Sequence, residues 1–153
     1  MENTEFLWTD GTNKDFCEFY RITEDFYSSL VGGENKRTSF IPYNASADIP
    51  DVLIAYVGGR PVGCAGLKKY SQTQAEIKRV WVQPDARGQH IASRMMDLVE
   101  RKAKEQGFEQ VILQTRLLMK EAVGMYLRRG YKLTENYPPY DKLEGAVCYA
   151  KDL

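Results

Sequence analysis

The stretch VWVQPDARGQHIASRMM, residues 80–96, has the residue types and order of an anion-binding turn. A strand pattern ends at Pro84, and the polar residues after it lead directly into a helical pattern that begins at Ile91. The first turn of a helix leaves backbone N–H groups unpaired and carries a partial positive charge of about +0.5. Gly88 would let an anion approach those groups, and Arg87 adds a full positive charge. The turn therefore fits a diphosphate, although a tight turn with a solvated arginine fits the same residues.

The region from Glu76 to Tyr131 resembles the acyl-CoA-binding core of the GNAT superfamily of N-acyltransferases. The phosphate loop of that family reads Arg/Gln-x-x-Gly-x-Gly/Ala. The positions of this chain that match the loop are Arg87, Ile91 and Ala92, and Gly88 stands at the second place, which is frequently glycine. His90 departs from the pattern, because the family usually has glycine there. If that position requires a positive φ, the histidine could weaken cofactor binding.

A second family signature, Ala-x-x-x-Tyr-x-x-x-Gly-Phe/Tyr, follows the first in the correct order. The matching residues are Ala122, Tyr126, Gly130 and Tyr131. The family often has asparagine three residues before the alanine, where this chain has Met119. The two signatures together imply one GNAT-like domain over residues 1–153, with acetyl-CoA as the acyl-donor cosubstrate.

The resemblance also implies where the cosubstrate binds. The residues expected to bind it are Val80, Trp81, Val82, Arg87, Gly88, Gln89, His90, Ile91, Ala92 and Ser93. The pantetheine arm would pair with the backbone of Val80 and Val82, and one of these amides would polarise the thioester carbonyl. The side chains of residues 80–82 are expected to be core and cover. His90 could contact a phosphate or face solvent, and Ser93 could bind phosphate or be an ordinary first-turn residue.

Tyr126 and Glu76 are the candidate catalytic residues. Acyl transfer from a thioester expels a thiolate, and a phenol with a pKa of about 10 can protonate it. Tyr126 matches the family tyrosine that points at the sulfur, but its spacing from Ala122 also fits a core-facing side chain. Glu76 could relay the proton of an amine whose pKa is about 10.4. It also fits an alternating strand with solvent-facing charges, in which Lys78 or Arg79 would be its ion partner.

Aromatic residues outside the two signatures could enclose the acceptor. In such proteins the early irregular segment and the loop before the last strand commonly form the walls of the acceptor site. Tyr43, Tyr137 and Tyr140 lie in those segments, where they would either stack on a substrate or seal the edge of the domain. Arg128 and Arg129 are interpreted as charges that complement the C-terminal end of a helix.

The elements that must position these residues follow from periodicity. Apolar spacings of three and four predict helices over 13–30, 91–106 and 120–129. We expect Asn13 to cap the start of the first helix, Gly32 and Gly33 to end it, and Gly107 and Gly130 to end the other two. The residues expected to face inward on the third helix are Ala122, Val123, Tyr126 and Leu127. Alternating or short apolar runs predict strands over 5–9, 51–57, 61–70, 76–82, 111–115, 131–133 and 146–150, with 34–50 as a loop. The fold class is α/β (α+β): a mixed, mostly antiparallel sheet flanked by helices. The strand–helix–strand passage from 76 to 115 requires a parallel pair, and the resemblance implies that this pair splays to form the CoA cleft.

Composition limits the function classes. The 153 residues carry 21 Lys and Arg against 21 Asp and Glu, which argues against a nucleic-acid or membrane-surface binder. No apolar run approaches the roughly 18–20 residues of a membrane span, and no export signal is visible, so we expect a cytoplasmic protein. Three scattered cysteines and one histidine provide no metal-ligand cluster, so no metal site is expected.

The sequence thus predicts an acetyl-CoA-dependent N-acetyltransferase whose acceptor is a primary amine of a small molecule, attacked directly. A protein or peptide N-acetyltransferase remains open, because the neutral charge does not distinguish a peptide from a small amine. A CoA-binding sensor without catalysis also remains open, since His90 and Met119 depart from the family pattern. Many relatives dimerise through edge strands, so a homodimer is an expectation that the sequence leaves undecided.

Overall fold

A seven-stranded sheet organises the residues that the computed structural model describes, 3–30 and 47–153. Its spatial order is β1-β2-β3-β4-β5-β7-β6, and every neighbouring pair is antiparallel except β4 and β5, which are parallel. The strands are β1 (Thr4–Thr9), β2 (Asp51–Val57), β3 (Arg60–Lys69), β4 (Gln74–Val82), β5 (Gln110–Arg116), β6 (Lys132–Thr134) and β7 (Ala146–Asp152). The helices are α1 (Lys14–Leu30), the short 3-10 helix η3 (Pro84–Ala86), α2 (Ile91–Glu105) and α3 (Lys120–Arg128). The predicted element order and fold class are confirmed, and η3 is the one described helix that periodicity did not predict.

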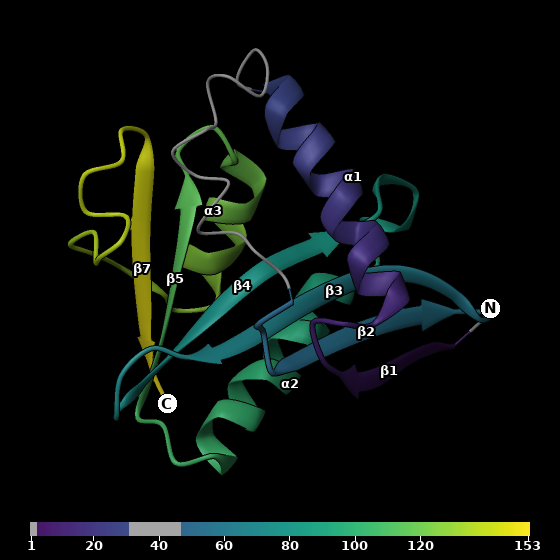
Figure 1. The fold of residues 1–153 in the computed structure, drawn as a ribbon, viewed down its shortest axis with the longest axis horizontal. Coiled ribbons are helices and arrows are strands. Elements are labelled where there is room, and N and C mark those ends of the chain that lie inside the picture. Colours follow the sequence, from purple (N-terminus) through teal and green to yellow (C-terminus); the bar gives the residue numbers. More distant parts are fainter. Residues whose placement is uncertain (1–2, 31–46) are drawn as a thin grey trace.

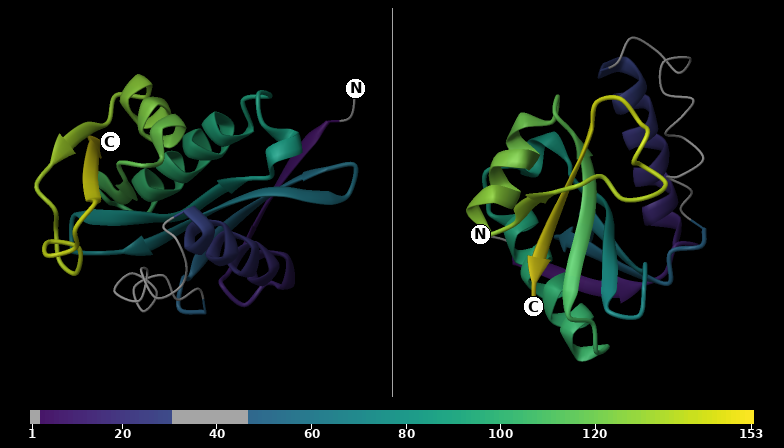
Figure 2. Two further views of the ribbon diagram at one scale, coloured as in Figure 1. Left: turned by 90° about the horizontal axis from the view of Figure 1, so that it is seen from above. Right: turned by 90° about the vertical axis from the view of Figure 1, so that its left-hand side faces the viewer.

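The helices cover opposite faces of the sheet (Figures 1 and 2). Helix α1 lies on one face, and α2 and α3 lie on the other. Since α2 connects β4 to β5, it supplies the crossover that the parallel pair requires. Strands β2 and β3 are buried on both faces, which explains their nearly continuous apolar sequences.

Each face of the sheet has its own core. On the α2 face, Met95, Met96 and Val99 pack with Leu113 and the two tyrosines of α3 and its C-terminal turn. On the α1 face, Phe16 and Phe19 pack with Trp81 and residues of β2 and β3. A third, smaller cluster joins Tyr140 to β7. The part of the chain that the structure describes contains no helix long and apolar enough to cross a membrane.

Caps fix where the helices begin and end. The Asn13 side chain accepts hydrogen bonds from the amides of Asp15 and Phe16 at 2.9 and 3.1 Å, so the predicted N-cap of α1 is confirmed. After α2, the amide of Gly107 donates to Lys104 and the next amide donates to Ala103, with Gly107 at φ 92°. This is the Schellman arrangement that the glycine predicts. The predicted stop of α1 at residues 32–33 lies outside the described residues.

Strands β4 and β5 separate halfway along their length (Figure 1). Their parallel pairing runs from Gln74–Gln110 to Ile77–Leu113 and ends there. On its other edge, β4 is irregular: Gly66 lies opposite Lys78 and Cys64 lies opposite Trp81, so that two β4 residues face one β3 residue. This is a β-bulge, which bends a strand and interrupts its ladder. The predicted splay therefore exists, and it begins at the bulge.

Candidate functional site

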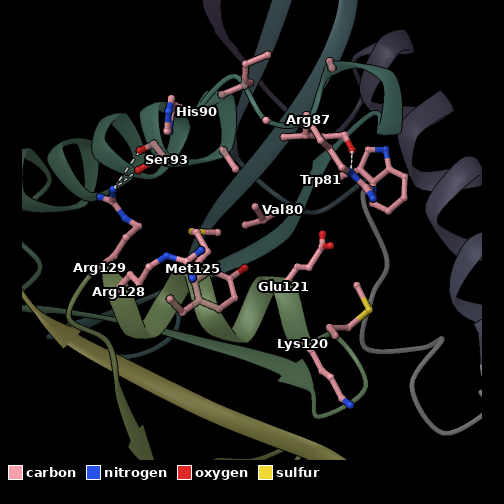
Figure 3. Close-up of a pocket in the computed structure, with 18 of the residues that line it drawn as sticks. Val80, Trp81, Arg87, His90, Ser93, Lys120, Glu121, Met125, Arg128 and Arg129 are labelled. Carbon is pink, nitrogen blue, oxygen red and sulfur yellow. Dashed lines mark hydrogen bonds between the residues drawn. The ribbon is translucent and has the colours of Figure 1, made fainter.

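A cavity of about 950 Å³ opens beside the splayed half of β4. It lies between the start of α2 and one side of α3, with Val80 of β4 between them (Figure 3). Cavities that bind small molecules and cofactors commonly measure about 300–1,000 Å³. The site is therefore large enough for an extended ligand.

The structure gathers most of the predicted cofactor-binding residues around this cavity. Nine of the ten line it, namely Val80, Trp81, Val82, Arg87, Gly88, His90, Ile91, Ala92 and Ser93. Gln89 is exposed and is not among the lining residues. The side chains of Trp81 and Val82 are buried in the two cores, as expected.

The start of α2 presents its backbone to the cavity. The amide of Arg94 donates to the carbonyl of His90 at 3.0 Å, which is the first bond of the helix, and residues 91–93 line the cavity. The amides of these first-turn residues precede that bond and have no carbonyl within the helix to pair with. Gly88 has a φ of 84°, and a Cβ built there would meet nothing within 4 Å. The turn is therefore open to an anion.

His90 occupies a left-handed conformation, with φ 61° and ψ 21° at the N-cap of α2. Such a conformation favours glycine, which is what the family has at this position. The His90 side chain is exposed and makes no capping hydrogen bond. The interpretation of His90 as a solvent-facing residue with a compromised backbone is consistent with this geometry.

Arg87 is turned back toward the strand rather than toward the amides of α2. Its Nε donates to the carbonyl of Val82 at 2.9 Å, and its guanidinium lies 4.8 Å from the centre of the Trp81 ring. The Trp81 indole N–H in turn donates to Gln83 at 2.9 Å. Arg87 therefore fixes the end of β4 and contributes positive charge along one wall of the cavity.

Tyr126 lies in the cavity wall because of how α3 ends. The amide of Gly130 donates to Leu127, and the amide of Tyr131 donates to the Tyr126 carbonyl at 3.0 Å. This Schellman motif brings the two tyrosine rings together, with centroids 5.6 Å apart. Tyr126 is 5% exposed, packs in the core and also lines the cavity, so a core-facing side chain and a position in the cavity wall are both compatible with its place on α3. The prediction that Leu127 also faces inward is wrong, because it is 52% exposed.

Glu76 lies on the opposite face of the sheet and does not line the cavity. It is 7% exposed, so the interpretation of Glu76 as a solvent-facing charge is wrong. Its carboxylate accepts a hydrogen bond from the Tyr137 hydroxyl at 2.9 Å and lies 3.6 Å from Lys78 Nζ. Lys78 is thus its ion partner, whereas Arg79 pairs with Glu24 of α1. Pairing between β4 and β5 ends one residue after Glu76, so Glu76 lies next to the point where the two strands separate.

Three tyrosines enclose this carboxylate. The rings of Tyr70 and Tyr137 are 5.0 Å apart, and those of Tyr137 and Tyr140 are 5.4 Å apart, both edge to face. Burial, reinforced by the negative charge of Glu76, raises the pKa of the Tyr137 and Tyr140 hydroxyls. Burial also lowers the pKa of Lys78 despite its acidic partner. Tyr137 and Tyr140 therefore help to bury the Glu76 carboxylate, while Tyr43 lies outside the described residues.

Arg129 does more than complement the end of a helix. It reaches from the C-cap of α3 to α2, where it donates to Ser93 Oγ at 2.9 Å and pairs with Asp97 at 2.6 Å and Glu100 at 3.0 Å. Arg128, in the last turn of α3, keeps the predicted position. The Ser93 hydroxyl is therefore part of a bridge between two helices that face each other across the cavity, as Figure 3 shows.

Several lining residues were not predicted from sequence. Met119, the N-cap of α3, and Met125 line the cavity together with Tyr126. Met119 lies seven residues before Tyr126, a spacing of two helical turns that could have identified it. Glu121, in the first turn of α3, is also exposed and turns its carboxylate toward the cavity (Figure 3). Phe26 reaches the cavity from α1 and contacts the Trp81 ring at 5.2 Å. No local pattern indicates that contact, because it joins residues 55 positions apart.

Comparison with known proteins agrees with the geometry. The acetyltransferase (GNAT) family model matches residues 6–131. An IAA acetyltransferase of Azospirillum brasilense is 30% identical over 94 residues, which cover 60% of this chain and 61% of that protein. An aminoalkylphosphonate N-acetyltransferase of Salmonella typhimurium is 39% identical over 57 residues, or 37% of each chain. The match thus spans less than two thirds of either curated relative.

Solved structures show the same fold over the whole chain. The PaiA N-acetyltransferase from Thermoplasma acidophilum, solved in complex with coenzyme A, superimposes with a TM-score of 0.76. The two chains are 16% identical, and the match covers 99% of each. At this low identity the agreement shows that the two chains share a fold.

Proposed function

Because the chain belongs to the acetyltransferase (GNAT) family, we propose that it transfers an acetyl group from acetyl-CoA to a primary amine of a small molecule. One observation carries this proposal: the open first turn of α2 and the Tyr126 side chain line the same cavity. An anion-binding helix start and a phenol are the two groups needed to hold a diphosphate and to protonate a thiolate.

The chain's own residues fit acetyl-CoA. The amides of residues 91–93 and the Gly88 turn would hold the diphosphate, and the backbone of Val80 and Val82 would hold the pantetheine arm. Acetyl-CoA, when bound, supplies the acetyl group through its thioester. Phosphate contacts at a helix start are made by backbone amides, so His90 in place of glycine preserves the donor as long as its φ stays positive.

Tyr126 and Glu76 would move the two protons of the reaction. Glu76, directly or through a water molecule, takes the proton from the attacking amine, because only the neutral amine is nucleophilic. Tyr126 gives a proton to the sulfur as the carbon–sulfur bond breaks. The two groups lie on opposite faces of the sheet, so the acceptor would approach from the α1 face, through the splay beyond Ile77.

The enclosure of Glu76 favours a small acceptor. The edge-to-face rings of Tyr70, Tyr137 and Tyr140 surround a buried carboxylate, an environment that suits an ammonium group. One relative is named for aminoalkylphosphonates, which are small primary amines. We therefore place the small-molecule acceptor ahead of a peptide.

The test of Tyr126 is its replacement by phenylalanine. We expect Tyr126→Phe to lower kcat by about 10²-fold, the lower end of what general acid catalysis contributes, with acetyl-CoA affinity within about threefold. The control is Tyr131→Phe, which loses the same hydroxyl from the neighbouring ring, where it donates to Glu100 at 2.8 Å. Its kcat should stay close to that of the wild type. Equal kcat for Tyr126→Phe and wild type would remove Tyr126 from the mechanism.

The acceptor class requires an amine panel. Thiol release from acetyl-CoA should be measured with aminoalkylphosphonates, amino acids, polyamines and peptides with free amino termini, beside calorimetric titration of CoA. Release with small amines and not with peptides supports the proposal. Release with peptides alone would favour a peptide N-acetyltransferase, and tight CoA binding without release on any amine would favour a sensor.

A further inference from the structure

Arg79 has a backbone conformation that its residue type disfavours. Its φ is 58°, in the left-handed region, and it lies in the β-bulge where β4 leaves β5. Residues other than glycine seldom occupy this region, and they do so where the surrounding structure fixes them. The residue that forms the bulge is therefore held by something outside its own backbone.

The Arg79 side chain is anchored to α1. Its Nη1 pairs with Glu24 at 3.0 Å, its Nη2 donates to the Thr23 hydroxyl and to the Tyr20 carbonyl at 3.3 Å, and its guanidinium lies 4.5 Å from the centre of the Tyr20 ring. The arginine side chain is 5% exposed and that of Glu24 is 17% exposed. These contacts come from one turn of α1 and define the position of the guanidinium, and thereby the direction in which Arg79 leaves the strand.

The carbonyl of Arg79 is fixed from the other side. The Cys64 thiol of β3 donates to this oxygen at 3.2 Å. Burial raises the pKa of Cys64 to about 12, so the thiol keeps its proton and remains a donor. In a trans peptide the C=O and the following N–H point in opposite directions. Since the Arg79 carbonyl faces β3, the N–H of Val80 faces away from β3, toward the side from which β5 has departed.

Glycines on β3 allow this close packing. A Cβ at Gly66 would come within 3.2 Å of the Lys78 carbonyl, and a Cβ at Gly63 would come within 2.9 Å of the Trp81 carbonyl. The backbone around the bulge is thus pressed against β3 on one edge while its other edge opens to the cavity that Val80 lines.

We infer that Arg79 is a positioning residue, whose attachment to α1 holds the bulge in its left-handed conformation and so aims the Val80 amide at the acyl carbonyl of the bound thioester. The inference rests on the proposed function, which places that carbonyl beside β4. It assigns to the contact between Arg79 and α1 a part in catalysis although the side chain touches neither substrate. The bulge and α1 then act as one unit, because a substitution at Glu24 changes the direction of the Val80 N–H, 56 residues later in the chain.

The test compares two substitutions that remove the same contacts. Arg79→Ala and Arg79→Gly both lose the guanidinium, but only glycine adopts a φ near 58° without strain. We expect Arg79→Ala to lower kcat by about 10²-fold, as loss of one oxyanion donor does, with acetyl-CoA affinity within about threefold. Arg79→Gly should recover at least tenfold of that loss. Glu24→Gln, which keeps Arg79 and weakens its anchor, should lower kcat about tenfold in the same assay.

A second hydrogen bond between α1 and the sheet provides the control. The Tyr56 hydroxyl donates to Asp15 at 2.7 Å and joins α1 to β2, away from the bulge. Tyr56→Phe should lower thermal stability and leave kcat unchanged. If Arg79→Ala lowers stability and leaves kcat unchanged in the same way, or if the glycine and alanine variants lose kcat equally, the positioning role is refuted.

The conformation can also be measured without any acceptor. The ¹³Cα and ¹³Cβ chemical shifts of residue 79 report a positive φ, and they should lose that signature in Glu24→Gln. Unchanged shifts in Glu24→Gln would refute the anchoring role. If the wild type shows the signature but neither binds acetyl-CoA nor releases thiol, the proposed function fails while this measurement still decides what holds the bulge.

Discussion

Replacing His90 by glycine should stabilise the protein. His90 is the N-cap of α2 at φ 61°, it is exposed, and its side chain makes no capping hydrogen bond. His90 therefore has the energetic cost of a left-handed backbone, and no capping hydrogen bond from its side chain offsets that cost. A glycine at the same position would adopt the conformation freely.

The size of the effect follows from two opposing contributions. A left-handed conformation costs a residue with a Cβ about 1–2 kcal/mol. Glycine loses more backbone entropy on folding, which costs about 0.5–1 kcal/mol. The central values leave a net gain in the free energy of unfolding of about 0.75 kcal/mol, or a rise in Tm of about 2–3 °C for a chain of this length.

The same reasoning predicts little change in affinity. The amides of the α2 start already have their conformation before a ligand arrives, so the strain is present in both the free and the bound protein. Calorimetry with acetyl-CoA should give a Kd for His90→Gly within about twofold of the wild type.

The assay is urea unfolding of His90→Gly beside His90→Ala. Alanine removes the ring but keeps the Cβ, so it should not gain stability. Equal stabilisation by both substitutions would show that the ring, and not the backbone, is unfavourable. A destabilised glycine variant would refute the reasoning altogether.

Three further predictions concern stability. Gly63→Ala would place a Cβ 2.9 Å from the carbonyl of Trp81, so we expect a loss of about 1–3 kcal/mol in urea unfolding; an unchanged Tm would contradict the tight contact. Cys64 has a folded pKa raised from 9.0 to about 12, so its protonated thiol stabilises the fold below pH 9 and that contribution is lost as pH rises toward 12. The stability of the wild type relative to Cys64→Ala should therefore fall by up to about 1.4 kcal/mol per pH unit above pH 9, and a constant difference would contradict it. Arg129→Met should lower the free energy of unfolding by about 2 kcal/mol, which is below the usual cost of breaking a buried ion pair. The cost is smaller because Lys151 still pairs with Glu100 at 2.9 Å. An unchanged Tm in thermal melts of the variant would contradict this prediction.

Local sequence was sufficient for the elements and for the two signature turns. Gly107 and Gly130 have a positive φ where their helices end. The helix-ending turn alone requires this conformation, so the glycine in the local sequence is enough to predict it. The same turn explains why a tyrosine at position 126 and another at position 131 occur together, since the Schellman motif brings them into contact. Periodicity therefore predicted that Ala122, Val123 and Tyr126 of α3 face inward, but it overestimated the buried face at Leu127.

Tertiary contacts decided what periodicity could not. The sequence of β4 alternates too weakly to show a bulge, and the residue that forms it, Arg79, is read locally as an exposed cation. Its partners lie 55 to 59 residues earlier, in a helix that covers the other face of the sheet. Glu76 was ambiguous for the same reason, because the residue that buries it and donates to it, Tyr137, lies 61 positions later. Loop closure over such distances leaves no local signal.

Among the described residues, Arg79 and His90 are the two that have a positive φ without being glycine, and they bracket the strand end and turn that line the cavity. Strain of this kind persists where the surrounding structure fixes it or where the site requires it. The two positions differ in what fixes them: Arg79 is tied to α1 by an ion pair and two hydrogen bonds, whereas His90 is exposed. The same change to glycine should therefore have opposite effects, a gain of stability at 90 and a loss at 79. Two gains would mean that the anchor to α1 contributes nothing to the bulge, and two losses would mean that the His90 ring has a partner in solution.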